Sequence, residues 1–557
     1  MKVLKWIKEK SALQQIDGSL LIFLLLFVNV KLWIKVLTII IICLINRKNL
    51  SKTLLIKNRL LLFYLSVILL TVINILVQIG YLSLPYLLAA GVGILFWLIA
   101  ALASYLCFVY VEKYEAEKIH STISMFFMIN VLVTFITLGR IIIETGAFNP
   151  YTYQGMYQKY FIMTGDYMRG ISFDTSTTNA LLHAFGIVYF LDRRNGLAVL
   201  LCMAGLLLTG SNFTNLLLIL TLIYLFIFQS SRDQKSLISI CVFLLIIFSA
   251  KISPQNNDYA LNTFRKIFQL KTKNIAKTNA NVVEITTMPD SILNADDRKR
   301  KFAMLYLDSI ETLKRERELL TVKTNIPDTK NAHLVSLESG ESHKPAIPKD
   351  DIHSKPFQRN KAETPLQKEL ISFVKQEEKE SKKVLLDSGA TKLPGKLIAM
   401  KQTLNFLKDH PKKMITGDGT GNFSSKLAFR TTGLNIAGGY PSGFVYIHND
   451  FRDNHLAVFL NYFSRDAGVH SVIHSPNSVY NQLLGEYGIA GMIAFLFLYV
   501  GQFIKKRKYL TYGIPLLLLT MGAFFIEYWF EQLSIVVVFE LMLFLNIREN
   551  TVKDEVL

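Results

Sequence analysis

Apolar residues fill long blocks of the chain, and short polar stretches separate one block from the next. A block of about 20 apolar residues is long enough to cross a bilayer as a helix, and helices are favoured there because they pair their own backbone groups. The pattern predicts an all-α polytopic membrane protein with about twelve transmembrane helices. The predicted spans are residues 19–30, 32–46, 60–79, 84–111, 121–143, 174–192, 197–210, 212–229, 236–251, 475–504, 510–526 and 531–547.

Two of these boundaries are weakly marked. Only Lys31 and Lys35 interrupt the run from 19 to 46, so one long tilted helix is an alternative to the first two spans. Only "TGSN", residues 209–212, divides the seventh span from the eighth.

Composition and charge add an orientation to this layout. Hydrophobic residues make up 51% of the 557 residues, more than is usual in a soluble multidomain protein. Short cytoplasmic loops collect Lys and Arg, and a twelve-span layout places the basic clusters on one side with both termini in the cytoplasm. Because the formal charge of +19 is spread along loop ends, we predict no nucleic-acid partner. The basic clusters are residues 2–10, 47–59, 193–194 and 505–508.

The first apolar block lacks a small-residue cleavage site, so we interpret it as a retained span and not as a signal peptide. All four cysteines fall within predicted spans, and this placement suggests neither a disulfide framework nor a cysteine metal site.

The layout divides the chain into four parts. Residues 1–251 hold the first nine spans with an outer loop at 144–173, and residues 252–474 form a large extracytoplasmic loop. Residues 475–547 hold the last three spans, and 548–557 form a cytoplasmic tail.

The large loop changes character along its length. Residues 271–392 are rich in Lys, Glu, Asn, Ser and Thr, a mixture that buries too little apolar surface to fold, so we predict a disordered insertion with a helix at 296–320. The remainder, 396–474, is predicted to be ordered. It begins with an amphipathic helix, "KLIAMKQTLNFLKDHPKKM", that must end before Pro411. The following "GDGTG" lacks the strand and helix of a nucleotide loop, so we interpret it as a tight turn.

The segment "HNDFRDNH", residues 448–455, concentrates groups that can bind a cation: His448, Asp450, Asp453 and His455. The competing interpretation is a polar loop in which Arg452 pairs with a neighbouring Asp. We favour that interpretation and predict neither a metal nor a cofactor.

Basic residues outside the predicted membrane suggest a phosphate-binding role. A guanidinium grips phosphate through two parallel hydrogen bonds and stays charged, so it can stabilise a diphosphate without metal. The candidates are Arg169, Arg430, Arg452 and Arg465.

Ionisable residues also occur within or beside the spans. Arg140 and Glu540 are costly in hydrocarbon, so we expect them to face the bundle interior and to pair with each other or line a lipid headgroup site. Glu527 and Glu531 flank "YWF" between the last two spans, which indicates either an interfacial aromatic belt or a sugar-stacking edge.

Candidate catalytic residues precede the tenth span. A histidine can take a proton from an attacking hydroxyl near neutral pH, and His470 and His474 lie close to Asn477 and Glu486 in the sequence. We therefore predict a catalytic group made of these four residues.

The segment "PNSVYNQLLGEYGIAG" resembles the signature of the O-antigen ligase and O-antigen polymerase superfamily. "LLTGSN", "DHPKKMITGDGTGNF" and "RGISF" resemble further elements of that family in the same order. Two positions depart from the pattern: Asn477 stands where many members carry a histidine assigned as base, and Asn212 replaces an arginine. Because asparagine cannot be a base, either His474 or His470 takes that role or this branch manages without it.

The resemblance implies a GT-C-like bundle in a bacterial cytoplasmic (inner) membrane and a metal-independent, inverting glycosyl transfer on its outer face. The donor would be a glycan on undecaprenyl diphosphate, and the acceptor another glycan or the lipid A core. The process would be synthesis of O-antigen, capsule or exopolysaccharide. A lipid-linked glycan flippase is the main alternative, and a membrane anchor that recruits envelope proteins is the second.

Overall fold

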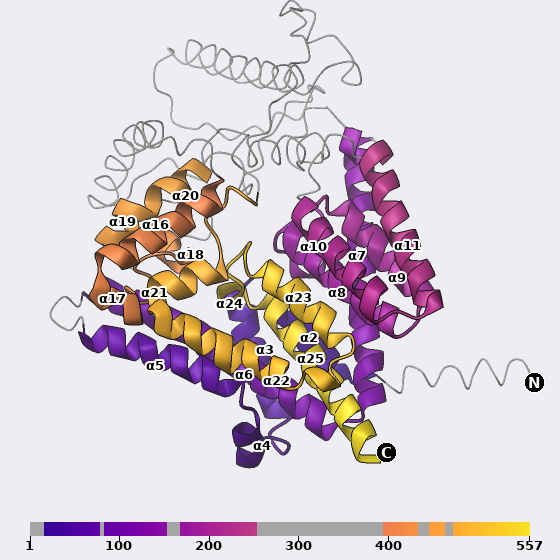
Figure 1. The fold of residues 1–557 in the computed structure, drawn as a ribbon, viewed down its shortest axis with the longest axis horizontal. Helices are drawn as coiled ribbons and strands as arrows, with labels where there is room; N and C mark the ends of the chain where they lie inside the picture. Colours follow the sequence, from indigo (N-terminus) through magenta and orange to yellow (C-terminus); the bar gives the residue numbers. More distant parts are fainter. Residues whose placement is uncertain are drawn as a thin grey trace, which may run out of the picture.

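The computed structural model describes residues 16–77, 83–146, 148–152, 167–252, 394–432, 440, 445–462 and 472–556. Within these ranges the fold is all helical and contains no strand (Figure 1). The helices of the first half are α2 (Gly18–Phe27), α3 (Leu32–Ile45), α4 (Lys52–Lys57), α5 (Leu61–Val77), α6 (Leu84–Lys113), α7 (Ala116–Thr145), α8 (Ser176–Asp192), α9 (Gly196–Leu208), α10 (Asn212–Phe228) and α11 (Arg232–Ile247). Those of the second half are α16 (Gly395–Asp409), α17 (Pro411–Thr416), α18 (Lys426–Arg430), α19 (Asn449–Asn454), α20 (Leu456–Tyr462), α21 (Val479–Ala494), α22 (Gly501–Lys505), α23 (Gly513–Ala523), α24 (Trp529–Gln532) and α25 (Ser534–Val556).

Short turns of other helix types complete these elements. Two are π-helical, at Phe248–Ile252 after α11 and at Phe495–Val500 between α21 and α22. Three are 3-10 turns, at Pro150–Thr152, Gly170–Ser172 and Arg507–Tyr509.

Every apolar block predicted to be a span contains a helix, and the first block contains two. The backbone leaves the helical conformation between Phe27 and Leu32, so α2 and α3 are separate and the single tilted helix is wrong. Lys35 accounts for part of this break, because its buried ammonium donates to the Phe27 carbonyl at 2.5 Å. A cation at the carboxyl end of a helix satisfies a carbonyl that has no partner within the helix.

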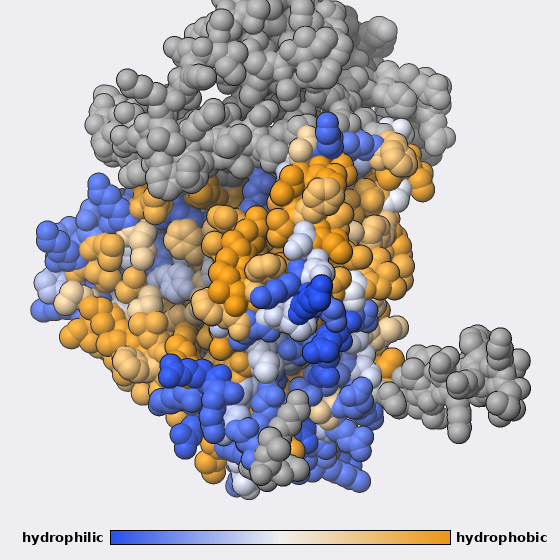
Figure 2. Space-filling view, turned by 45° about the vertical axis from the view of Figure 1, so that its right-hand side comes forward, coloured by the Kyte–Doolittle hydropathy of each residue, from blue (hydrophilic) through white to orange (hydrophobic). Residues whose placement is uncertain are grey.

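Among the residues that the structure describes, four helical stretches are both long and apolar enough to cross a membrane: Leu84–Lys113, Ala116–Thr145, Arg232–Ile252 and Val479–Lys505. Shorter apolar helices of 10–17 residues accompany them, and large apolar side chains such as Leu44, Ile136 and Phe243 are more than half exposed. Figure 2 shows apolar side chains across the middle of one face and hydrophilic ones gathered at its lower end. This surface is consistent with a membrane protein.

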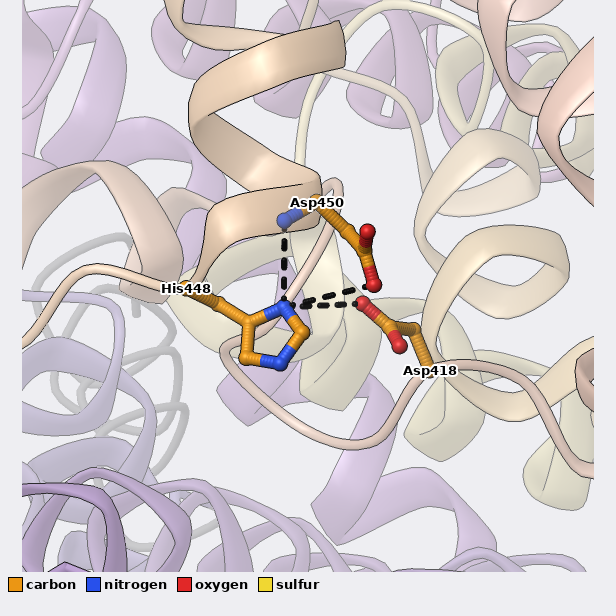
Figure 3. Close-up of side chains that lie close together, drawn as sticks. All are labelled: Asp418, His448 and Asp450. Carbon is orange, nitrogen blue, oxygen red and sulfur yellow. Dashed lines mark hydrogen bonds and ion pairs between the residues drawn. The ribbon is translucent and has the colours of Figure 1, made fainter. Parts of the chain in front are cut away.

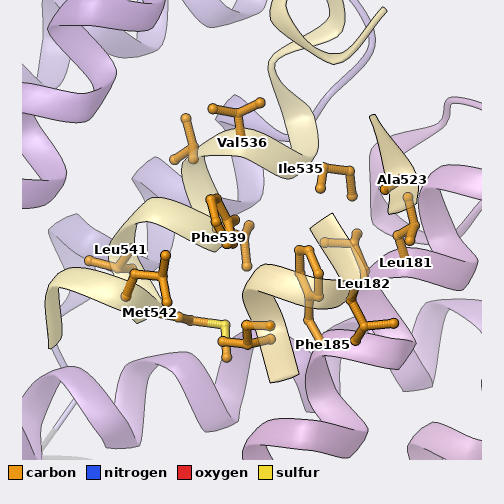
Figure 4. Packing of buried hydrophobic residues seen from close by; sticks show 14 of the residues in the cluster. Leu181, Leu182, Phe185, Ala523, Ile535, Val536, Phe539, Leu541 and Met542 are labelled. Carbon is orange, nitrogen blue, oxygen red and sulfur yellow. The ribbon is translucent and has the colours of Figure 1, made fainter. Parts of the chain in front are cut away.

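One large apolar core joins the amino-terminal helices to the carboxyl-terminal ones. Leu181, Leu182 and Phe185 of α8 lie against Phe539 and its neighbours on α25 (Figure 4). The core thus brings the two ends of the chain together although more than 300 residues separate them.

Helices α16 to α20 form a smaller unit beside the amino-terminal end of α21 (Figure 1). Phe429 stacks on Phe459 at 4.6 Å, and Tyr528 joins the same cluster from the turn before α24. Helix α16 ends at Asp409 and Pro411 opens α17, which confirms the helix predicted to stop before that proline. The predicted disordered insertion and its helix lie outside the described residues.

Of the two alternatives for Arg140 and Glu540, pairing with each other is wrong, and so is the expectation that Arg140 faces the bundle interior. Arg140 is exposed and pairs with Glu144 one turn away, at 2.6 Å. Glu540 is fully buried and accepts from the hydroxyls of Tyr64 and Tyr499. Both phenols donate to Oε1, so this oxygen has hydrogen-bond partners without a cation.

Candidate functional site

The segment 472–479, which leads into α21, is held between two other parts of the chain. On one side, Lys396 N–H donates to the Ile473 carbonyl at 3.3 Å, which attaches the segment to the start of α16. On the other side, Val479 N–H donates to the Phe524 carbonyl at 2.9 Å, which attaches it to the turn between α23 and α24. The candidate site is the start of α21 with the 524–528 turn, and α18 joins it through the contact of Lys426 with Glu527.

The "GDGTG" segment forms a buried loop against this end of α21. Gly417, Gly419 and Gly421 all have positive φ angles, a conformation that favours glycine. Asp418 N–H and Gly419 N–H donate to the carbonyls of residues 485 and 486 at 3.0 Å each. The predicted tight turn is confirmed, and its irregular backbone is paired by protein groups, as apolar surroundings require.

Glu486 lies beneath this loop and is 0% exposed. Its carboxylate accepts from Ser425 N–H at 3.1 Å, and the backbone amides of Gly421 and Phe423 stabilise its charge as well. Gly488, two residues later, has a φ of +64° and packs its backbone directly against Gly417. The glutamate and glycine of the signature therefore anchor the loop.

A more open polar group lies on the other side of the segment. Asn477 donates from Nδ2 to Glu527 Oε1 at 2.7 Å, and Lys426 Nζ lies 3.8 Å from the same oxygen. The side chains of Lys426 and Glu527 are 21% and 15% exposed. Sequence order separates these three residues widely, so the fold alone creates the group.

Lys396 stabilises this arrangement through two backbone carbonyls. Its buried ammonium donates to the carbonyls of Asn477 and Ile526, the second at 3.1 Å. Burial lowers the pKa of Lys396 to about 7, and the negative charge of Glu527 opposes that shift. One side chain thus ties both backbone segments of the polar group together.

A second carboxyl group, that of Glu531 in α24, accepts a hydrogen bond through each of its oxygens. Glu531 accepts from Gln482 Nε2 at 2.7 Å through one oxygen and from Leu427 N–H at 3.1 Å through the other. Arg430, at the end of α18, is half-buried and its charge acts on Glu531.

The predicted histidines are only partly placed. His474 accepts from Gly395 N–H through Nδ1 at 3.4 Å, and its ring is half-buried. Asn477 lies in segment 472–479 and Glu486 lies in α21, and their side chains face different neighbours, the 524–528 turn and the glycine loop. His470 lies outside the described residues, so its assignment stays a prediction.

The predicted arginines do not gather at one point among the described residues. Arg169 is half-buried, its guanidinium lies 4.7 Å from the ring centre of Tyr167, and Gly170 beside it packs onto Asn130 and Asn179 of α7 and α8. Arg452 pairs with Asp453 at 2.7 Å, as the polar-loop interpretation predicts. Arg465 lies outside the described residues.

Three groups with metal-ligating atoms do meet near the glycine loop: Asp418, His448 and Asp450 (Figure 3). Their ligand atoms lie within 4.8 Å of one another. Lys413 Nζ lies 2.6 Å from Asp418 and 2.5 Å from Asp450, so one ammonium bridges both carboxylates. Of the four candidates in "HNDFRDNH", only His448 and Asp450 take part, because Asp453 pairs with Arg452 and His455 contacts Thr403.

The sequence indicated some parts of the site and missed others. The sequence marks Glu527 only as part of an aromatic belt or a sugar-stacking edge, and its contact with Asn477 has no local signal. Lys396, Lys413 and Lys426 were hidden among many lysines of a basic chain. Their contacts in the folded chain distinguish them: Lys396 with the Asn477 carbonyl, Lys413 with Asp418 and Asp450, and Lys426 with Glu527.

Comparison with known proteins adds no further assignment: no protein-family model, no curated protein and no solved structure matches the chain.

Proposed function

We propose that this protein is a membrane glycosyltransferase of the O-antigen ligase or polymerase type. It would act in a bacterial cytoplasmic membrane with a twelve-span, GT-C-like bundle and both termini in the cytoplasm. The donor would be a glycan on undecaprenyl diphosphate and the acceptor a glycan or the lipid A core. The transfer would be inverting and independent of metal and cofactor, and would serve cell-surface polysaccharide synthesis.

One observation carries this proposal: a partly exposed group of acidic, amide and basic side chains lies at the first turn of a long apolar helix. Glu527, Asn477 and Lys426 supply these three kinds of group, and α21 begins two residues after Asn477. A lipid-linked sugar needs that combination, because its prenyl chain lies in the membrane while its diphosphate and sugar meet polar groups at the end of the helices.

Basic residues close to this group suit the diphosphate. Lys426 and Arg430 occupy one helical turn of α18, beside the 524–532 segment. Cations aimed at a developing phosphate charge stabilise the leaving group in the transition state. Arg169 does not gather with them among the described residues, and we propose it as a further diphosphate ligand from the α7 and α8 side.

Arg169→Ala tests the function in cells. We expect loss of long-chain surface glycan and accumulation of lipid-linked glycan, with transfer reduced about 100-fold, the effect of removing one charge-stabilising group. The measurement is chromatography of extracted lipid-linked glycan together with an electrophoretic profile of surface glycan. Arg140→Ala is the matched control, because Arg140 is an exposed arginine of α7 that pairs with Glu144 one turn away. Normal surface glycan in the Arg169 variant would contradict its role on the diphosphate.

A further inference from the structure

We propose that Glu527 is the general base that accepts the proton of the acceptor hydroxyl, and that Asn477 positions it. This inference rests on the proposed glycosyl transfer and names a residue that the family signature does not. It also resolves the difficulty that Asn477 cannot itself take a proton.

The two oxygens of Glu527 have different surroundings. Oε1 accepts from Asn477 Nδ2 at 2.7 Å and from Tyr528 N–H at 3.1 Å, and Lys426 lies 3.8 Å away. Oε2 has no hydrogen-bond partner within the part of the chain that the structure describes, and the side chain keeps 15% of its exposure. One oxygen is thus fixed by protein donors and the other is presented to an incoming hydroxyl.

Other acids near the start of α21 lack this property. Glu486 is 0% exposed beneath the glycine loop. Each oxygen of Glu531 accepts a hydrogen bond from the protein. Glu527 therefore differs from both in combining a fixed orientation with an accessible oxygen, which are the geometric requirements of a general base.

The geometry also disfavours His474 as the base. Its Nδ1 accepts a hydrogen bond from Gly395 N–H, which places the proton of the neutral ring on Nε2. The nitrogen that could take a proton is therefore already engaged.

Asn477 and Lys396 hold the base in place. The Asn477 amide donates to Oε1, and the Lys396 ammonium binds the carbonyls of residues 477 and 526 on either side of the contact. An asparagine at this position orients a carboxylate as a histidine could, but it leaves proton transfer to that carboxylate.

The reaction step balances without a co-reactant. The acceptor oxygen forms a bond to the anomeric carbon while its proton passes to Oε2 of Glu527. The bond between the anomeric carbon and the diphosphate oxygen breaks, and its electron pair leaves with the lipid diphosphate. Lys426 and Arg430 face that leaving group, and the protonated Glu527 then releases its proton to water.

The test uses purified full-length protein in lipid vesicles, supplied with lipid-linked glycan and with lipid A core, both extracted from cells that lack the gene. We expect Glu527→Gln to lower kcat about 100-fold or more with little change in KM, as loss of a general base does. Glu527→Ala should regain activity when formate is added, because a small carboxylate can occupy the vacated position. A purely structural role would show neither the selective loss of kcat nor the rescue.

Glu531→Gln is the matched control four residues away. The Gln482 amide can turn and present its unbonded Oε1 to the new amide, so both hydrogen bonds persist and activity should stay near wild type. If wild type makes product and Glu527→Gln makes it equally fast, or if both glutamines lose activity alike, the base assignment is overturned. If wild type itself makes no product from these extracts, the proposed function fails instead.

Discussion

Two carboxylates near the start of α21 have opposite surroundings. Glu486 is fully buried and is bonded by the backbone of the glycine loop. Glu527 lies on the other side of segment 472–479. Its side chain is partly exposed, and one of its oxygens accepts a hydrogen bond from Asn477. The comparison separates two roles. Glu486 and Gly488 of the signature hold the glycine loop against α21, and we call this packed unit the platform. Glu527, from the distant 524–528 turn, is best placed for proton transfer.

Gly488→Ala should have the largest effect on the platform. A Cβ at this position would lie 2.5 Å from both Gly417 N and Ile415 O, and its φ of +64° adds backbone strain. Because those neighbours are backbone atoms, α21 and the loop must separate. We expect a loss of more than about 4 kcal/mol, measured as thermal stability of the purified protein in detergent.

Gly91→Ala is the control for that substitution. A Cβ on Gly91, in α6, meets no atom within 4 Å, so alanine should leave stability unchanged or raise it by about 0.5 kcal/mol. Equal stability of Gly488→Ala and Gly91→Ala would break the view that the signature glycines build the platform.

Much of this platform can be predicted from the sequence, whereas the partly exposed group of Asn477, Glu527 and Lys426 cannot. Apolar blocks predict the helices because burial and length leave lipid-facing segments little choice. The turn at "GDGTG" follows from its glycines. By contrast, the contact between residues 477 and 527 depends on how the 524–528 turn folds back across 472–479, and no local pattern encodes such a long-range approach.

Lys413→Met tests the ion pairs at the edge of the glycine loop. Lys413 binds both Asp418, which is buried, and Asp450. Removing the ammonium leaves two carboxylates against each other, and we expect a loss of about 2–3 kcal/mol, because the lysine is partly exposed and the usual penalty is higher in a dry site. The measurement is the thermal stability of the variant against wild type at pH 7.

The same variant has a defined pH dependence. Burial raises the pKa of Asp418, whereas Lys413 and His448 lower the pKa of Asp450 although burial opposes them. In wild type, the contribution of Asp450 is therefore present above its ordinary pKa of 3.8 and is lost as the pH falls below it. Without Lys413 the two acids bind protons more readily, so the difference from wild type should shrink as the pH falls from 7 towards 4. A difference that grows on acidification would contradict the assignment of Lys413 as their shared partner.

Glu486→Gln sharpens the comparison with the smallest expected effect. The glutamine oxygen can still accept from Ser425 N–H, but its amide hydrogens then face other backbone donors of the loop. We expect a loss of about 1–2 kcal/mol in stability. The rate per folded molecule of Glu486→Gln should fall less than tenfold. Glu527→Gln should instead lose rate and keep its stability, because residue 527 is partly exposed and the glutamine oxygen can still accept the hydrogen bond from Asn477. Measuring both quantities on both variants separates platform from chemistry, and a Glu486 variant that stays fully stable but loses its rate would move the proton transfer back to the buried side.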